Sequence, residues 1–158
     1  MLRSFCLSEA SKQETEMSDD LVYQSFEIAA EQAGDITGSV YEKYFAACPG
    51  SEDLMAHIDE IVRGKMMSEV FRLLMVEDYL DEAVYLTWEV KNHEFAYSVE
   101  PQMYGNLFSA VLETMEESLG DAWNLEYEQA WIARIEKMTQ EILPRFSQLV
   151  REDPKPPG

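Results

Sequence analysis

The sequence is poor in the residues that build most metal and disulfide sites. Its 158 residues include two cysteines and two histidines, which excludes a disulfide framework and any metal site built from several histidines. Basic residues are scarce as well, because 12 lysines and arginines stand against 31 acidic residues, for a net charge of −19. Nucleic acids and anionic membrane surfaces are bound by basic faces, so we expect neither as a partner.

Long apolar runs and catalytic motifs are also missing. No stretch of 18 or more apolar residues occurs, so we expect no transmembrane helix. The apolar stretch Phe5–Leu7 is too short for a signal peptide, and we therefore expect a cytoplasmic protein. The sequence has no glycine-rich phosphate loop, no Cys-x-x-Cys pair and no nucleophile elbow, so no catalytic residue is assigned.

What the sequence does contain is helical periodicity. Apolar residues recur every three or four positions, and the strict alternation that marks strands is absent. The mass of 18.2 kDa allows one domain with one sizeable core. We predict an all-α domain over residues 18–150, with a disordered segment over residues 1–17 and a flexible tail over residues 151–158.

Capping residues and helix breakers divide the domain into about six predicted helices. The predicted helices lie between Ser18 and Gly34, Asp35 and Pro49, Ser51 and Glu77, Asp78 and His93, Pro101 and Gly120, and Asn124 and Pro144.

His93 is the histidine that falls on an apolar helix face. It continues a series of apolar residues at alternating spacings of four and three, which lie on one side of a helix. A single neutral imidazole in such a place can ligate haem iron, because the macrocycle supplies the other four ligands. A di-iron bundle would need a glutamate three residues before each histidine, and neither His57 nor His93 has one. A histidine that only packs in the core is the alternative interpretation of His93.

The segment that follows His93 resembles the proximal segment of globins. In that family the haem-ligating histidine is followed by a branched aliphatic residue six positions later. A proline often follows at eight positions and an aromatic residue at eleven. Val99, Pro101 and Tyr104 occupy these three positions.

Two other segments resemble globins in the expected order. Residues 40–49 are similar to the second globin helix with its terminal proline, Pro49. Tyr41 stands eight residues before that proline, where bacterial globins often carry a distal tyrosine. Residues 119–124, together with residues 130–131, resemble the junction between the last two globin helices.

The resemblance covers roughly residues 20–145 and implies a globin-like fold, with about six main helices around a pocket for haem b. It implies that His93 Nε2 ligates the iron and that Nδ1–H donates to a backbone carbonyl one turn earlier. Two positions depart from the family. Met55 replaces the phenylalanine that wedges against haem, and Val62 stands near the usual distal histidine or glutamine. The cofactor-binding residues that the resemblance implies are Tyr41, Phe45, Met55, Val62, Met66, Val90, Val99, Tyr104 and Leu107.

The function that the resemblance implies is reversible binding of dioxygen or another diatomic gas. Storage, sensing and nitric oxide dioxygenation are all compatible with it, and dioxygenation would need an external reductase. Met55 and the apolar distal residues keep a second hypothesis open, a haem-free globin-like interaction or sensor module. A third hypothesis is an unrelated helical bundle that acts as a binding protein. The sequence also leaves a homodimer open.

Overall fold

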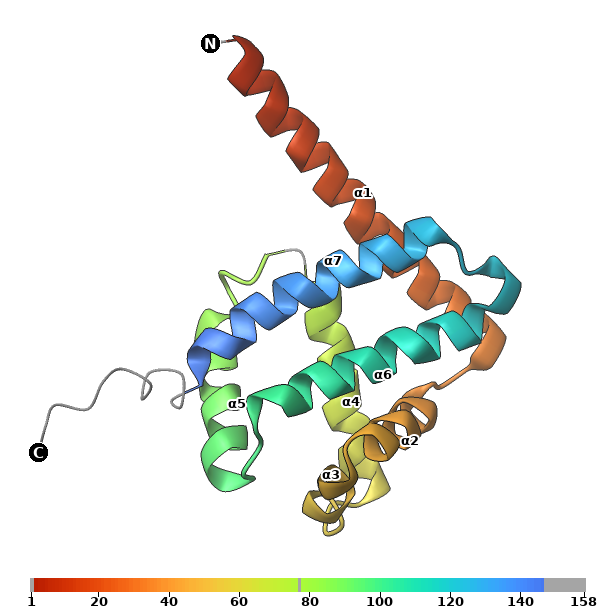
Figure 1. Cartoon of the computed structure of the whole chain (residues 1–158), viewed down its shortest axis with the longest axis vertical. Coiled ribbons are helices and arrows are strands. Elements are labelled where there is room, and N and C mark those ends of the chain that lie inside the picture. The colour runs from red at the N-terminus through yellow and green to blue at the C-terminus, as the bar shows by residue number, and fades with distance from the viewer. Residues whose placement is uncertain (1, 77, 147–158) are drawn as a thin grey trace, which may run out of the picture.

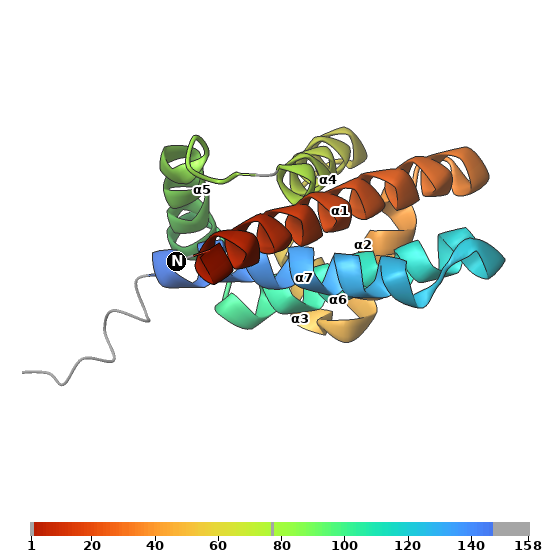
Figure 2. The ribbon, with the colours of Figure 1, turned by 90° about the horizontal axis from the view of Figure 1, so that it is seen from above.

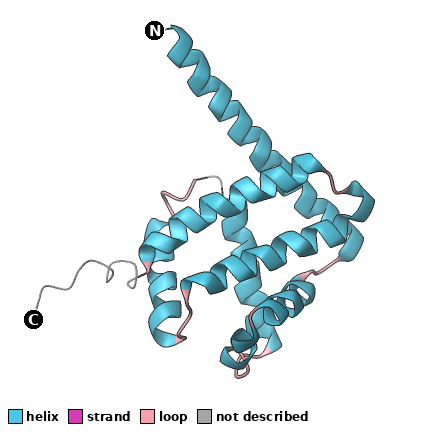
Figure 3. Cartoon of the chain, in the orientation of Figure 1, coloured by secondary structure: helices cyan, strands magenta, loops and turns pink. Residues whose placement is uncertain are grey.

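The computed structural model describes residues 2–76 and 78–146, with side chains for Met17 and from Asp19 onward. All of these described residues lie in helices or in the turns between them, without a strand (Figure 3). The helices are α1 (Leu2–Ala33), α2 (Thr37–Ala47), α3 (Pro49–Leu54), α4 (Glu60–Met75), α5 (Ala83–Ala96), α6 (Pro101–Leu119) and α7 (Leu125–Ile142), and two 3₁₀ turns cover Gly120–Ala122 and Leu143–Arg145. The all-α prediction is therefore confirmed.

Helices α6 and α7 run side by side through the middle of the molecule (Figures 1 and 2). Helix α1 crosses both of them, and its N-terminal half projects beyond the rest of the molecule (Figure 1). Helix α2 packs against α6. Helices α4 and α5 each pack against α7. In the part of the chain that the structure describes, α4 and α5 do not pack closely against each other.

The core forms where α1, α6 and α7 meet. Trp131 is completely buried, and its Nε1–H donates to Ser25 Oγ at 2.7 Å. Ser25 in turn donates to the carbonyl of Val22 at 2.8 Å, so the indole nitrogen and the hydroxyl are both satisfied. Buried Arg134 pairs with Asp19 and donates to a backbone carbonyl after α4, which ties α7 to α1 and to α4. The other fully buried side chains of large volume are Phe108, Phe146, Met67, Leu74, Leu86, Met115, Ile142, Val22, Val40, Val90 and Val111.

The N-terminal segment differs from the prediction. Residues 2–17 were expected to be disordered, whereas α1 runs from Leu2 to Ala33. No glycine or proline interrupts the sequence before Gly34, and residues 8–17 are rich in glutamate, alanine, lysine and glutamine. These residues favour helix, which explains the longer α1. The predicted flexible tail over residues 151–158 lies outside the described residues.

The prediction of a single long helix after Ser51 is also wrong, because two helices occupy this stretch of the chain. Helix α3 ends at Leu54, and α4 begins only at Glu60. The Asp59 carboxylate accepts from the Val62 backbone N–H at 2.9 Å, and this N-cap starts a new helix. Helix α5 likewise begins at Ala83, four residues later than Tyr79, because the preceding residues form a turn.

The last helix is predicted to depend on its N-cap. The side chain of Asn124 accepts from the Tyr127 backbone N–H at 2.9 Å, at the start of α7. We expect Asn124→Ala to lower the free energy of unfolding by about 1 kcal/mol in urea denaturation. Asn124→Asp, which keeps a capping oxygen, should lose much less. An equal loss in both variants would contradict the capping role.

Candidate functional site

His93 lies on the side of α5 that is partly covered by the core. Val90 and Leu86, one and two turns earlier, are buried and fix the orientation of this helix. The side chain of His93 is 23% exposed. Burial lowers the pKa of His93 below its usual value, because a charged imidazolium would lose hydration there. The imidazole is therefore neutral at pH 7, which is the form that binds metals.

Both ring nitrogens of His93 have partners. Nδ1 lies 2.5 Å from the hydroxyl oxygen of Tyr104 on α6. Nε2 lies 3.0 Å from Oε1 of Glu89, one turn earlier on α5. If Glu89 is ionised, Nε2–H donates to it and Nδ1 accepts from the Tyr104 hydroxyl. The backbone carbonyl that we expected as the partner of Nδ1 is thus replaced by Tyr104.

Glu89, His93 and Tyr104 form a half-buried polar cluster, which we call the proximal cluster. Burial raises the pKa of Glu89, and the nearby carboxylate of Glu69 on α4 raises it further. Burial also raises the pKa of Tyr104 above its usual value, so the phenol stays protonated at neutral pH. The proximal cluster therefore holds the imidazole ring in place from two sides.

A second cluster, which we call the Arg63 cluster, contains Tyr41, Phe45, Met55 and Arg63. The hydroxyl of Tyr41 donates to the backbone carbonyl of Arg63 at 2.9 Å, and burial raises its pKa to about 12. The rings of Tyr41 and Phe45 are stacked with centroids 5.6 Å apart. The Arg63 guanidinium lies 5.4 Å from the centroid of Phe45 and donates through Nη2 to the Met55 carbonyl at 2.6 Å. Arg63 Nε is buried and has no hydrogen-bond partner among the described residues.

Side chains connect α4 and α5 at two places. Arg72 on α4 donates to both carboxylate oxygens of Glu82, next to the start of α5, at 2.7 and 3.1 Å. His57, which is exposed and precedes α4, stacks on Tyr97 at the end of α5 with ring centroids 6.4 Å apart. Because these contacts flank the proximal cluster, they limit how far α4 and α5 separate.

The remaining predicted site residues are not gathered in one place. Val90 is buried in the core, and Leu107 is half-buried and packs against it. The backbone N–H of Val99 donates to the carbonyl of His93 at 3.0 Å and closes the end of α5. Val62 is exposed on α4, and Met66 is half-buried. The structure therefore brings Tyr104 directly to His93 and joins Tyr41, Phe45 and Met55 around Arg63.

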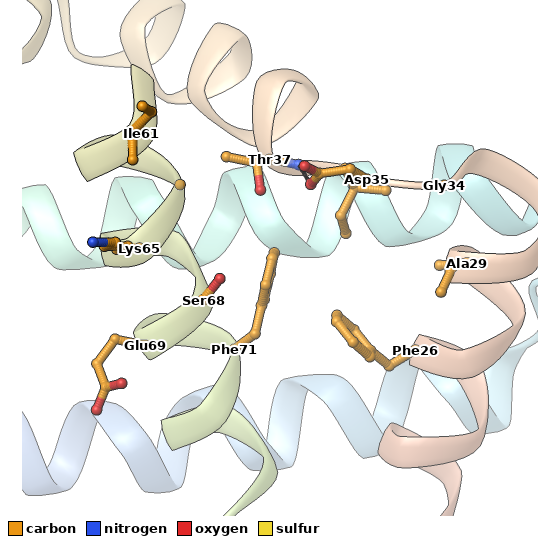
Figure 4. A pocket seen from close by; sticks show the side chains of 13 residues that line it. Phe26, Ala29, Gly34, Asp35, Thr37, Ile61, Lys65, Ser68, Glu69 and Phe71 are labelled. Atoms are coloured by element: carbon orange, nitrogen blue, oxygen red, sulfur yellow. Dashed lines mark hydrogen bonds between the residues drawn. The ribbon is translucent and has the colours of Figure 1, made fainter. Parts of the chain in front are cut away.

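A groove of about 690 Å³ lies elsewhere, between α1, the turn before α2 and α4. Figure 4 shows Phe26 and Phe71 pointing into this groove and Lys65 at its border. A smaller pocket of about 340 Å³ includes Tyr104 but not His93. His93 lines neither pocket, so neither pocket offers a slot for haem beside Nε2 of His93.

Two further observations limit the kinds of site. Among residues 17–76 and 78–146, no three histidine, cysteine, aspartate or glutamate side chains are grouped so that they could hold a metal ion. No helix in the described part of the chain has both the length and the apolar character needed to cross a bilayer. A protein-only metal centre is therefore not supported within those residues.

The imidazole of His93 fits the role of a haem ligand only after Glu89 moves, and neither described pocket provides room for the macrocycle beside it. The neutral imidazole of His93 meets one requirement of an axial ligand, and its contact with Tyr104 meets a second once the ring proton sits on Nδ1, so that Nδ1–H donates to the Tyr104 hydroxyl oxygen and Nε2 keeps its lone pair. The contact between Nε2 and Glu89 does not suit an axial ligand, because iron needs the Nε2 lone pair. The Glu89 side chain is 25% exposed and unbranched, so a change of rotamer toward solvent would release Nε2.

Two residues of the site, Glu89 and Arg63, were not predicted from the sequence. Glu89 precedes His93 by four residues, and this spacing alone places both side chains on neighbouring turns of one helix face. That signal was available. Arg63 carried no such signal, because its contacts with Phe45 and Met55 depend on the break between α3 and α4.

Comparison with known proteins adds no family to this description. No protein-family model matches the sequence, and no curated protein matches it significantly.

Proposed function

We propose that this protein is a globin-like protein that binds haem b through Nε2 of His93. A diatomic gas, with dioxygen as the first candidate, is the proposed ligand, and neither nucleic acid nor a membrane is a proposed partner. The observation that carries the proposal is the neutral, largely buried imidazole of His93, which Tyr104 holds through Nδ1. Haem would supply the iron to which the gas binds.

The residues around His93 have defined tasks in this proposal. Tyr104 orients the imidazole through Nδ1, and the hydrogen bond from Val99 N–H fixes the backbone at His93. Glu89 must turn away from Nε2. Tyr41 would act as a hydrogen-bond donor to the gas only after its hydroxyl leaves the Arg63 carbonyl, to which it now donates. Met66 on α4, which is half-buried, is the apolar residue proposed to exclude water on the distal side, whereas Val62 is exposed to solvent and does not serve this task.

An absorption titration tests this proposal directly. Purified protein is mixed with hemin, and the Soret band is followed in the ferric, ferrous and carbonyl-bound forms. We expect a saturable band at one haem per chain, shifted from that of free hemin. A spectrum that remains that of free hemin at all protein concentrations would reject haem binding.

A haem-free module is the second candidate function, and the contact between Glu89 and His93 favours it specifically. In the described structure this contact occupies the nitrogen that iron would need. The imidazole would then serve only to connect α5 to α6 through Tyr104. If hemin does not bind, while His93→Phe lowers the melting temperature as expected for a structural hydrogen-bonded group, the second candidate is supported.

A further inference from the structure

We propose that the outer face of α5 joins two copies of this chain in an antiparallel dimer. Val84, Trp88 and Phe95 lie on this face and are 84%, 61% and 62% exposed. Such exposure is unusual for three large apolar side chains on one helix, and it marks an interaction surface. Helix α5 stands at one end of the molecule (Figures 1 and 2), and the exposure of these side chains shows that no described helix covers this face.

The spacing of these residues fits a second copy in particular. Val84, Trp88, Lys91 and Phe95 follow each other at intervals of four, three and four residues. These spacings put the four residues along one seam of a helix pair, and because the order is the same when read backwards, the seams also match when two copies lie antiparallel. When two copies of α5 align in opposite directions, Val84 of one copy lies opposite Phe95 of the other. Trp88 then lies opposite Lys91, and each pairing occurs twice.

The charge on this face supports the same pairing. Lys91 is exposed and takes part in none of the ion pairs found among the described residues. In the antiparallel arrangement its ammonium group meets the Trp88 ring of the other copy, which is a favourable cation–π contact. The indole and the lysine therefore complement each other, whereas a parallel pair would bring Lys91 against Lys91.

The size of the face sets the strength of the dimer. A stable interface buries about 800 Å² on each partner, and one face of a 14-residue helix offers less. The net charge of −19 on each copy adds repulsion, which salt screens. We therefore expect a reversible dimer with a Kd on the order of 10–100 μM at 0.15 M salt.

Sedimentation equilibrium of the full chain tests the proposal. The wild-type protein should show a monomer–dimer equilibrium, and Val84→Glu or Phe95→Lys should each raise the Kd about tenfold or more. Because both side chains are exposed in the monomer, neither change should affect folding. Leu125→Glu is the matched control, since Leu125 is 64% exposed on α7, away from this face. The dimer Kd of this variant should equal that of the wild type.

The orientation is tested by combining the two substitutions. In the antiparallel dimer, Glu at position 84 faces Lys at position 95 of the other copy, so Val84→Glu with Phe95→Lys should restore much of the lost affinity. A parallel pair would bring like charges together, and the double variant would then be weaker than either single variant. A wild-type protein that stays monomeric at 500 μM (about fivefold above the upper end of the expected Kd range) overturns the proposal. Equal weakening by Leu125→Glu, or no recovery in the double variant, also overturns it.

Discussion

Replacing His93 with alanine is expected to lower haem affinity by at least about 100-fold and to remove the shifted Soret band. The reason is that His93 carries the proposed iron ligand, and changes to groups that merely orient a metal ligand already cost 10–100-fold. The measurement is the hemin titration described above, made on the wild type and the variant side by side. Circular dichroism of the variant should retain the helical signal, since buried Leu86 and Val90 still anchor α5 in the core.

His57→Ala is the control for this prediction. His57 is the other histidine of the chain, is exposed, and stacks on Tyr97 outside the proximal cluster. Its removal should leave the Soret band unchanged. Free imidazole added to His93→Ala should restore part of the band if the variant keeps its fold. A variant that binds hemin like the wild type would assign the iron ligand to another residue.

Replacing Glu89 with leucine is expected to raise haem affinity about tenfold or more. In the wild type, the hydrogen bond between Glu89 and Nε2 must break before iron can bind, and such a bond to a charged group contributes about 1.5–3 kcal/mol. The variant has no such bond to break. It also removes a half-buried carboxylate whose raised pKa shows that its charged form is poorly accommodated.

Glu116→Leu provides the matched control, because it removes the same charge from an exposed position on α6. Its haem affinity should equal that of the wild type within about twofold, as expected for a distant surface change. If both leucine variants bind hemin more tightly, the gain comes from net charge rather than from the release of Nε2. If Glu89→Leu binds less tightly, Glu89 helps to form the site instead of competing for it.

Helices with strong local signals were predictable from the sequence. Pro101 and Gly120 bound α6, and Asn124 caps α7, as the residue types indicated. The boundary between α3 and α4 was not predictable in the same way, because the apolar spacing runs on through Ile58 and the break depends on the Asp59 cap. Local caps compete with continued periodicity, and spacing alone does not show which prevails.

The site was predictable only in part. The sequence correctly placed His93 on the inward side of its helix together with buried Val90, and it singled out Tyr104, which contacts the ring. The backbone carbonyl predicted as the partner of Nδ1 was wrong, since the contact with Tyr104 depends on how α5 and α6 meet in three dimensions. Haem binding and the globin-like arrangement stay predictions that the titration and the variants address.

The burial of Trp131 against Ser25 has a practical consequence for spectroscopy. Its indole is dry and hydrogen-bonded, whereas Trp88 is exposed on α5 and Trp123 is half-buried beside Tyr127. The three tryptophans of the chain should therefore emit at different wavelengths, with Trp131 the bluest and Trp88 the reddest. Fluorescence of single-tryptophan variants would then follow three events separately. Trp131 would report separation of α1 from α7, Trp123 a rearrangement of the turn after α6, and Trp88 the burial of the α5 face in the dimer.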